Sequence, residues 1–253
     1  MACAGAQPVQ LSQLADLPLE ALANIEVTSV SRRPESLLNA PASIYVITGE
    51  DIHRSGVTSL PEALRLAPNL QVARIDSGLY AISARGFNNV VSNKLLVLVD
   101  GRTIYTPLFS GVFWDQQNVM LEDIDRIEVI SGPGATLWGA NAVNGVINVI
   151  TRPAPQTQGA LFSGGAGNRQ HGAAARFGGE LGAGHYRVYA KASEVQNSRF
   201  AAGGPFPRPT AKSDGREHVQ MGFRADWGAS GDRFTLQGDT YRGTGEDPGA
   251  SLG

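Results

Sequence analysis

The chain contains very little cysteine and little net charge. Cys3 is the only cysteine among 253 residues, so the chain cannot form a disulfide with itself. Charged residues make up 17% of the sequence, and the formal net charge is −2. Nucleic-acid binding normally needs a basic patch, and this balance gives no support for one. Low charge combined with 31 glycines is unlike a disordered chain and favours β-structure with tight turns.

Long apolar runs are also missing. The longest, Leu95–Val99, has only the length of a strand, whereas a membrane helix needs roughly 18–20 apolar residues. The sequence therefore excludes helical membrane spans. It leaves open a transmembrane β-barrel, because barrel strands alternate in polarity and give a much weaker signal.

Catalytic and metal-binding motifs are absent as well. Neither the nucleophile motif G-x-S-x-G nor the phosphate loop G-x-x-x-x-G-K-[ST] occurs. The acidic residues Asp123, Asp125 and Glu128 fit a solvated or salt-bridged strand end better than an acid/base group. The histidines lack the spacing of metal ligands; they are His53, His171, His185 and His218. We therefore predict that the protein is not an enzyme and binds neither a metal nor a cofactor.

The most informative stretch is Ile124–Arg152, in which two β-type runs flank a glycine-rich turn. The runs are Ile124–Ile130 and Gly145–Thr151, and both carry polar residues within them. Glycine is used where the backbone needs a positive φ or where another chain passes close by. So many glycines beside inward polar groups indicate a small domain packed inside polar surroundings.

The residues before this stretch have a compact α/β pattern. Thr48 and Ser59 each precede an acidic residue by three positions, which is the capping box that begins a helix. Asp100-Gly101 is a favoured two-residue hairpin sequence. In chain order we predict strand Ser43–Ile47, a helix ending near Gly56, helix Leu60–Leu66, and strands Leu70–Ala73, Ala81–Ala84, Leu95–Val99 and Thr103–Thr106.

Two loops and one extended run lie outside the regular α/β pattern. The loop Tyr105–Asp115 is rich in aromatic residues, which either pack beneath the loop or face a ligand, and Arg74–Tyr80 is a second loop. An extended run, Ile25–Ser29, precedes the α/β pattern. It is either a strand that adds to the sheet edge of a partner or an edge strand of the following domain.

After Arg152 the composition changes to recurring strands of about ten residues, the length of a tilted membrane strand. Along His218–Trp227, apolar and polar residues alternate strictly, which indicates one apolar and one polar face. Long and short connections also alternate, as in outer-membrane barrels. A soluble β-sandwich is the alternative. The other predicted strands are Ala160–Gly167, Gly172–Leu181, His185–Ser193 and Arg233–Arg242.

Six segments together carry a resemblance to a known family. They are IEVTSVSRRPESLLNAPASIYVITGEDI, GVTSLPEALRLAPNLQV, ISARGFN, LLVLVDGR, IDRIEVISGP and LWGANAVNGVINVITR. In these motifs, from about Ile25 to Arg152, the chain resembles the TonB-dependent outer-membrane receptors. The resemblance implies an α+β plug domain followed by antiparallel strands of an incomplete transmembrane β-barrel. The family's complete barrel has roughly 22 strands around a plugged lumen.

The resemblance implies a division of the chain into five parts. Residues 1–24 are a leader, which is either a signal-peptide remnant or a disordered Gly/Ala-rich start. Residues 25–40 hold the TonB box and a linker, and residues 41–152 form the plug. Residues 153–158 are a second linker, and residues 159–253 supply about the first five strands of the barrel.

The resemblance also implies roles for particular residues. The TonB box, expected to pair with the periplasmic part of TonB, is Ile25, Glu26, Val27, Thr28 and Ser29. The ligand-side residues of the plug loops are Arg74, Asp76, Tyr80, Tyr105, Phe109, Phe113 and Trp114. The plug–barrel contact residues are Arg85, Arg126 and Glu128. Arg85 is expected to face barrel glutamates, whereas Ser131 stands where the family usually has a second arginine.

By resemblance the protein is an active transport receptor in the outer membrane of a Gram-negative bacterium. The plug would lie inside the barrel and the N-terminus in the periplasm. Its expected partners are TonB with its inner-membrane energising complex, outer-membrane lipid and a scarce nutrient, but not nucleic acid. A ferric siderophore or other iron complex is the favoured nutrient. Cobalamin or haem uptake, a signalling or adhesive receptor without transport, and a soluble periplasmic binding module are the alternatives.

Overall fold

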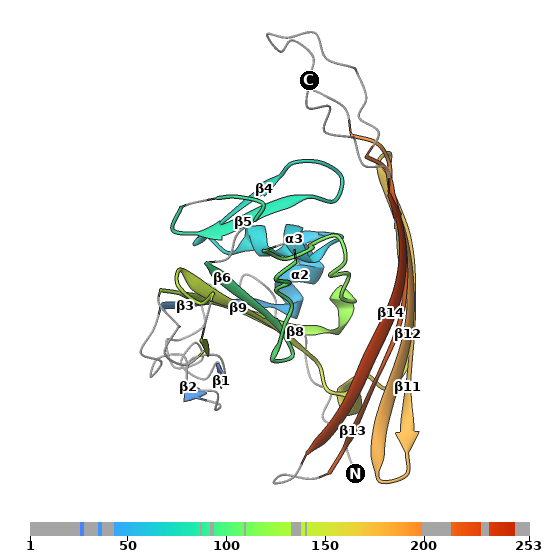
Figure 1. Cartoon of the computed structure of the whole chain (residues 1–253). Helices are drawn as coiled ribbons and strands as arrows, with labels where there is room; N and C mark the ends of the chain where they lie inside the picture. Colours follow the sequence, from blue (N-terminus) through green and yellow to red (C-terminus); the bar gives the residue numbers. More distant parts are fainter. Residues whose placement is uncertain are drawn as a thin grey trace.

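The computed structural model describes residues 26–27, 35–36, 43–86, 88–91, 94–108, 110–132, 138–139, 141–198, 214–228 and 233–245. It contains a small α/β unit packed beside a tall, curved sheet of long strands (Figure 1). The predicted leader, the TonB-box residues Ile25, Thr28 and Ser29, and the aromatic residue Phe109 lie outside the described residues.

The α/β unit is built on a five-stranded sheet with the order β3-β8-β9-β6-β7. Neighbouring strands are antiparallel except β6 and β9, which are parallel. A separate hairpin pairs β4 with β5, and β1 pairs with β2. The strands are β1 (Glu26–Val27), β2 (Glu35–Ser36), β3 (Ser43–Thr48), β4 (Leu70–Arg74), β5 (Tyr80–Ala84), β6 (Leu95–Val99), β7 (Arg102–Thr103), β8 (Ile124–Ser131) and β9 (Gly145–Thr151).

The first predicted helix is confirmed as α2 (Gly49–Ser55), with the complete capping box at Thr48 and a left-handed Gly56 after its last turn. The second is split into α3 (Leu60–Ala63) and a 3-10 turn, η3 (Leu64–Leu66). The capping box predicted at Ser59 is wrong, because the Ser59 side chain makes no cap hydrogen bond. The Glu62 carboxylate that would complete it instead accepts from Arg65 and from Tyr80.

The hairpin predicted at Asp100-Gly101 is confirmed, since both residues have positive φ, 48° and 79°. The strand that follows is shorter than the predicted Thr103–Thr106. It ends at Thr103 because Thr106 leaves the ladder and pairs with Gly111 instead.

The apolar core of the α/β unit lies between the sheet and helices α2 and α3, and includes Ile47, Ile52, Leu60 and Ile127. A smaller apolar cluster around Leu96 covers the other face. Most residues of β8 and β9 are therefore buried, including two of the polar residues predicted within them, Glu128 and Asn148. Arg126 donates to the buried Glu128 carboxylate across 2.8 Å.

The tall sheet consists of five consecutive antiparallel strands. Its polar face contacts the α/β unit, and its apolar face points away, with Val188 46% exposed and Met221 56% exposed. This confirms the predicted alternation, although four of the strands extend to 12 residues. The strands are β10 (Gly159–Ala166), β11 (Gln170–Leu181), β12 (Gly184–Val195), β13 (Arg216–Trp227) and β14 (Phe234–Gly245).

The remaining described elements are the single 3-10 turns η4 (Leu121–Asp123) and η5 (Ala154–Gln156). Within the described part of the chain, no helix is both long and apolar enough to cross a membrane.

Candidate functional site at the interface of the two units

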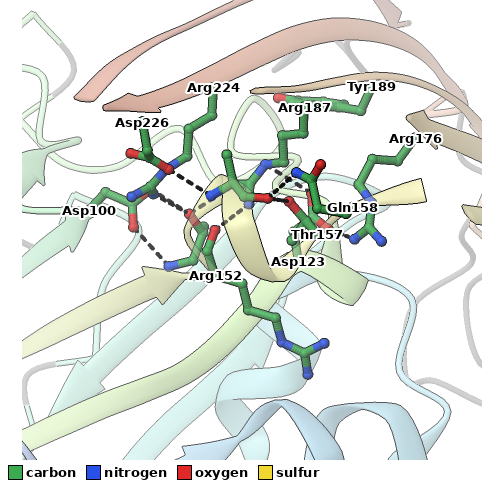
Figure 2. Close-up of polar contacts among 12 residues, drawn as sticks. Asp100, Asp123, Arg152, Thr157, Gln158, Arg176, Arg187, Tyr189, Arg224 and Asp226 are labelled. Carbon is green, nitrogen blue, oxygen red and sulfur yellow. Dashed lines mark hydrogen bonds and ion pairs between the residues drawn. The ribbon is translucent and has the colours of Figure 1, made fainter. Parts of the chain in front are cut away.

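The two units meet through a group of buried charges, shown in Figure 2, at the end of the interface that lies toward the bottom of Figure 1. Asp123, in η4 just before β8, lies between two arginines of the tall sheet, Arg176 on β11 and Arg187 on β12. The Arg187 Nε to Asp123 Oδ2 distance is 3.3 Å, and the Asp123 side chain is 2% exposed. Removing one partner of a buried ion pair costs about 3–5 kcal/mol. This contact therefore resists separation of the units.

The end of β9 is held by a second group of side chains in the same region. Thr151 Oγ1 accepts hydrogen bonds from Arg187 and from Arg224 on β13, both at 3.0 Å. The same hydroxyl donates to Asp100 Oδ2 at 2.8 Å, and the Thr151 N–H donates to Asp100 Oδ1 at 2.8 Å. Arg187 also donates to the Arg152 carbonyl. The hairpin aspartate is thus part of the interface.

The segment that follows β9 is also bound to the tall sheet. The Ala154 N–H donates to Asp226 Oδ2 across 2.6 Å, and the same oxygen accepts from Arg224 Nε at 2.9 Å. Gly178 of β11 lies so near the Thr157 carbonyl that a Cβ at Gly178 would collide with it. We call Asp100, Asp123, Thr151, Ala154, Arg176, Arg187, Arg224 and Asp226 the lower contact region.

A separate set of contacts forms at the upper end. The Ser77 N–H, in the turn between β4 and β5, donates to the fully buried Asp214 carboxylate across 2.9 Å. Arg216, at the start of β13, pairs with Asp115 at 2.7 Å. Its guanidinium lies on Gly78, where a Cβ would collide with it. We call Ser77, Gly78, Asp115, Asp214 and Arg216 the upper contact region.

A cavity of about 150 Å³ lies at the interface close to the upper contact region. The α/β unit contributes Glu62, Tyr80 and Trp114 to its lining, and the tall sheet contributes Gln170 and His218. The cavity is lined by both polar and apolar groups and has room for several water molecules.

This arrangement, an α/β domain held by buried charges on the polar face of long antiparallel strands, matches a known family. Residues 36–146 match the family described as TonB-dependent Receptor Plug Domain. The chain contains the plug domain of a TonB-dependent receptor. The α/β unit is its plug, and the tall sheet consists of strands of its barrel.

Relatives of the receptor support this assignment. The chain is 35% identical to a vitamin B12 transporter, BtuB, of Vibrio vulnificus over 144 residues, which is 56% of this chain and 23% of the relative. It is 37% identical to the iron-regulated outer membrane virulence protein of Vibrio cholerae over 131 residues, 50% of this chain and 20% of the relative. The chain thus spans about a quarter of the length of these relatives or less.

A solved structure shares the fold. The pyoverdine outer membrane receptor FpvA of Pseudomonas aeruginosa PAO1, bound to pyoverdine, superposes with a TM-score of 0.66 and 20% identity. The superposition covers 85% of this chain and 30% of FpvA. The receptor is accordingly an outer-membrane protein, as these relatives are.

The predicted ligand-side loop Arg74–Tyr80 is a well-organised turn of the receptor. Arg74 donates to the carbonyls of Asp76 and Ser77, and Asp76 Oδ1 accepts two backbone N–H groups of the turn. Tyr80 is 6% exposed, and its hydroxyl donates to Glu62 at 2.9 Å. Burial, more than the nearby Glu62 carboxylate, raises the pKa of Tyr80 to about 12, although Arg74 opposes the shift.

The aromatic side chains of the loop Tyr105–Asp115 differ in how deeply they are buried. Trp114 is only 7% exposed and belongs to the plug core, whereas Tyr105 and Phe113 are half-buried. The upper contact region includes Asp115, which follows Trp114, and Ser77 and Gly78 of the Arg74–Tyr80 turn. Ligand binding by these residues remains a prediction.

The predicted plug–barrel contact residues, Arg85, Arg126 and Glu128, are not part of the lower contact region. Arg85, with φ of 59°, is exposed at the end of β5 beside Gly132. Arg126 binds Asp125 at 2.7 Å and Glu128 at 2.8 Å, both on its own strand β8. Their contact with barrel residues therefore remains a prediction.

Sequence reasoning did not assign the lower contact region to the interface. The alternating pattern had placed Arg187, Arg224 and Asp226 on polar strand faces. The pattern did not indicate which plug residues these side chains contact.

The structure describes two residues of the predicted TonB box, Glu26 and Val27. Val27 is fully buried and lies opposite Glu35 in the short β1–β2 ladder. A two-residue ladder gives β1 few hydrogen bonds. Pairing of Ile25–Ser29 with TonB remains a prediction.

Proposed function

We propose that the full-length receptor binds a scarce nutrient at the cell surface and imports it into the periplasm with energy transmitted by TonB. The observation that carries this proposal is the plug held by buried charges on the polar face of barrel strands. A plug in that position closes the lumen, so passage of a nutrient requires the plug to change its conformation. Members of this family are transport receptors, in agreement with this requirement.

The two ends of the plug would have separate tasks in this function. A nutrient would bind on the outer side, at the turn Arg74–Tyr80 and the loop Tyr105–Asp115. Ile25–Ser29 would extend from the periplasmic side and add as a strand to TonB. Nutrient binding can expose that segment only if it favours one plug conformation over another.

We propose a ferric siderophore or another iron complex as the nutrient. The similarity to the iron-regulated outer membrane virulence protein supports an iron complex. Cobalamin is a second candidate, supported by the similarity to a protein named as a vitamin B12 transporter. The two identities, 37% and 35%, are too close to separate the candidates. Haem uptake and signalling without transport are further alternatives.

The gene for the full-length receptor should be deleted in its native bacterium to test this proposal. Uptake is then measured with radiolabelled iron on a catecholate siderophore, iron on a hydroxamate siderophore, haem iron and radiolabelled cyanocobalamin. We expect the deletion to abolish energy-dependent uptake of one probe, and the restored gene to return it. Unchanged uptake of all four would contradict the proposal. Loss of transcriptional induction with unchanged uptake would instead identify a signalling receptor.

A further inference from the structure

The start of β13 contacts both plug segments that are proposed to face the nutrient. Asp214, just before the strand, binds the turn Arg74–Tyr80 between β4 and β5. Arg216, the first residue of the strand, contacts the same turn. It also pairs with the end of the loop Tyr105–Asp115. Because Asp214 and Arg216 are two positions apart, one short stretch of barrel backbone meets both plug segments.

The Asp214 carboxylate joins the plug to two barrel strands. Its Oδ2 accepts the N–H of Ser77 in the plug turn at 2.9 Å, and its Oδ1 accepts the N–H of Ser198, just after β12, at 2.6 Å. The Ser77 hydroxyl also donates to the Asp214 carbonyl. Asp214 is fully buried, and hydrogen bonds to a charged acceptor are about twice as strong as neutral ones. The plug turn is therefore held firmly at Ser77.

Asn197 fixes the position of Asp214 itself. Its Oδ1 accepts the N–H of Asp214 at 2.9 Å and the N–H of Gly215 at 2.5 Å. These bonds join the end of β12 to the start of β13 without any plug residue. The Asp214 carboxylate is thus supported from the barrel side before it meets the plug.

The plug turn is braced internally, so a contact at Ser77 constrains all of it. Asp76 Oδ1 accepts the N–H groups of Gly78 and Leu79 at 2.9 and 2.7 Å. The N–H of Ile75 donates to the Leu79 carbonyl across 2.9 Å. A turn closed in this way moves as one piece when Asp214 or Arg216 moves.

Arg216 connects this turn to the aromatic loop. Its guanidinium lies against Gly78, where a Cβ would collide with it. The same side chain pairs with Asp115, the last residue of the loop, at 2.7 Å. The Arg216 and Asp115 side chains are only 29% and 24% exposed, so the pair is partly shielded from water. Arg216 therefore fixes the separation between the turn and the loop.

We propose that Asp214 and Arg216 are positioning residues for nutrient binding, which hold the turn Arg74–Tyr80 and the loop Tyr105–Asp115 at the separation that the nutrient requires. Asp214 is fully buried and acts through Ser77 rather than by touching the nutrient. If only a fraction of receptors holds the two segments in place, the apparent affinity falls by that fraction. The inference rests on the proposed function, because it assigns residues that organise the nutrient site.

The other end of β13 offers a matched control pair. Arg224 and Asp226 carry the same charges at the same spacing in reverse order, and they pair with each other at 2.9 Å. They bind the plug as well, at Thr151 and Ala154 in the lower contact region. Changes at this pair weaken the attachment of the plug but leave the contacts of Asp214 and Arg216 in place. Loss of stability and loss of positioning therefore give different results.

Hydrogen exchange of the nutrient-free, full-length receptor tests whether Asp214 holds the turn. Asp214→Asn replaces one carboxylate oxygen by an NH₂ group, which cannot accept the N–H of Ser77 or Ser198. We expect the peptide that contains Arg74–Tyr80 to exchange about tenfold faster, and Asp226→Asn to leave its exchange unchanged. Mass spectrometry measures both. Unchanged exchange in folded Asp214→Asn receptor would overturn the inference.

Binding of the four radiolabelled probes named above is titrated on cells at low temperature, and heat-dependent gel mobility confirms that each variant is folded. For the probe that the native receptor binds, we expect Kd to rise about tenfold in Asp214→Asn. Arg216→Gln should raise it about two- to fivefold, since its ion pair is partly exposed. This variant also tests the inference if Asp214→Asn does not fold. Arg224→Gln and Asp226→Asn should keep the native Kd.

Three results would contradict these expectations in different ways. A native Kd in both Asp214→Asn and Arg216→Gln would overturn the positioning role. An equal rise of Kd in the two control variants would also overturn it, because the loss would then come from general destabilisation. A native receptor that binds none of the four probes would refute the proposed function, whereas the exchange measurement would still decide whether Asp214 holds the turn.

Discussion

Arg187 of β12 donates a hydrogen bond across 3.0 Å to the hydroxyl of Thr151, the last residue of β9. The same guanidinium contacts Asp123, which lies beside the start of β8. One barrel side chain thus binds the beginning of one central plug strand and the end of its neighbour. Its position makes the stability of the plug dependent on the barrel wall.

Loss of the Asp123 charge should weaken this attachment. Asp123→Asn leaves Arg176 and Arg187 without their carboxylate, at a cost of about 3–5 kcal/mol. We expect the plug of the full-length receptor to unfold at a lower urea concentration, as followed by tryptophan fluorescence. Asp125→Asn is the control, because Asp125 is 40% exposed in its pair with Arg126 and such pairs contribute about 0–1 kcal/mol. Equal shifts would contradict the assigned role of Asp123.

A methyl group at Gly178 should disturb the chain segment that connects the plug to the first barrel strand. Gly178→Ala places a Cβ against the Thr157 carbonyl, which is backbone and cannot rotate away. Overpacking of this kind costs about 1–3 kcal/mol. We expect less folded receptor in the outer membrane, measured by heat-dependent mobility in gel electrophoresis. Gly165→Ala, on the neighbouring strand with open space around it, should leave the amount unchanged. A normal yield for Gly178→Ala would refute the close approach.

Tyr80 should ionise at a higher pH than an ordinary tyrosine. Its pKa is raised to about 12 from a model-compound value of 10.0, so the folded receptor retains this proton more strongly than the unfolded chain. The resulting stabilisation is complete below pH 10 and is lost as the pH rises through about 12. Ultraviolet titration of the full-length receptor minus the Tyr80→Phe variant measures this phenol alone. Tyr45→Phe, which removes a more exposed tyrosine, serves as the comparison. A difference curve centred at the ordinary value would disprove burial of the hydroxyl.

Proline at the predicted TonB box should separate binding from transport. Val27→Pro removes a backbone N–H that strand addition to TonB would use. We expect nutrient binding to persist while uptake is abolished, measured with labelled probe on cells at low temperature and then on energised cells. Val27→Thr keeps both the N–H and a β-branched side chain, so it should transport normally. Undiminished uptake by Val27→Pro would show that the TonB box lies elsewhere.

Local signals in the sequence were reliable where neighbouring residues settle the structure. The capping box at Thr48 and the hairpin at Asp100-Gly101 were predicted correctly, because each depends on side chains and backbone angles within four residues. The same motif at Ser59 failed because Glu62 found partners outside its own turn. One carboxylate oxygen of Glu62 accepts a hydrogen bond from the hydroxyl of Tyr80, 18 residues away in the chain. A tertiary contact thus replaced a local one.

The lower contact region shows the complementary case. Arg176 and Asp123 are 53 residues apart and Arg224 and Asp100 are 124 apart, and neither pair has a spacing that predicts contact. Alternation placed the barrel arginines on a polar face, since side-chain direction in a strand repeats every two residues. It could not show that Asp123 and Thr151 would lie opposite them. Arg126, an expected interface residue, binds Glu128 on its own strand, and its contact with the barrel remains a prediction.

The sequence by itself determined the family, the plug followed by alternating strands, and the two faces of those strands. These properties follow from motif order and from side-chain periodicity, which are both written along the chain. Only the tertiary structure decided that Arg187 meets Thr151 and Asp123 on one side of the plug. The reason is that such contacts depend on how the plug is placed against the barrel, and that placement is set by packing and charge between segments far apart in the chain.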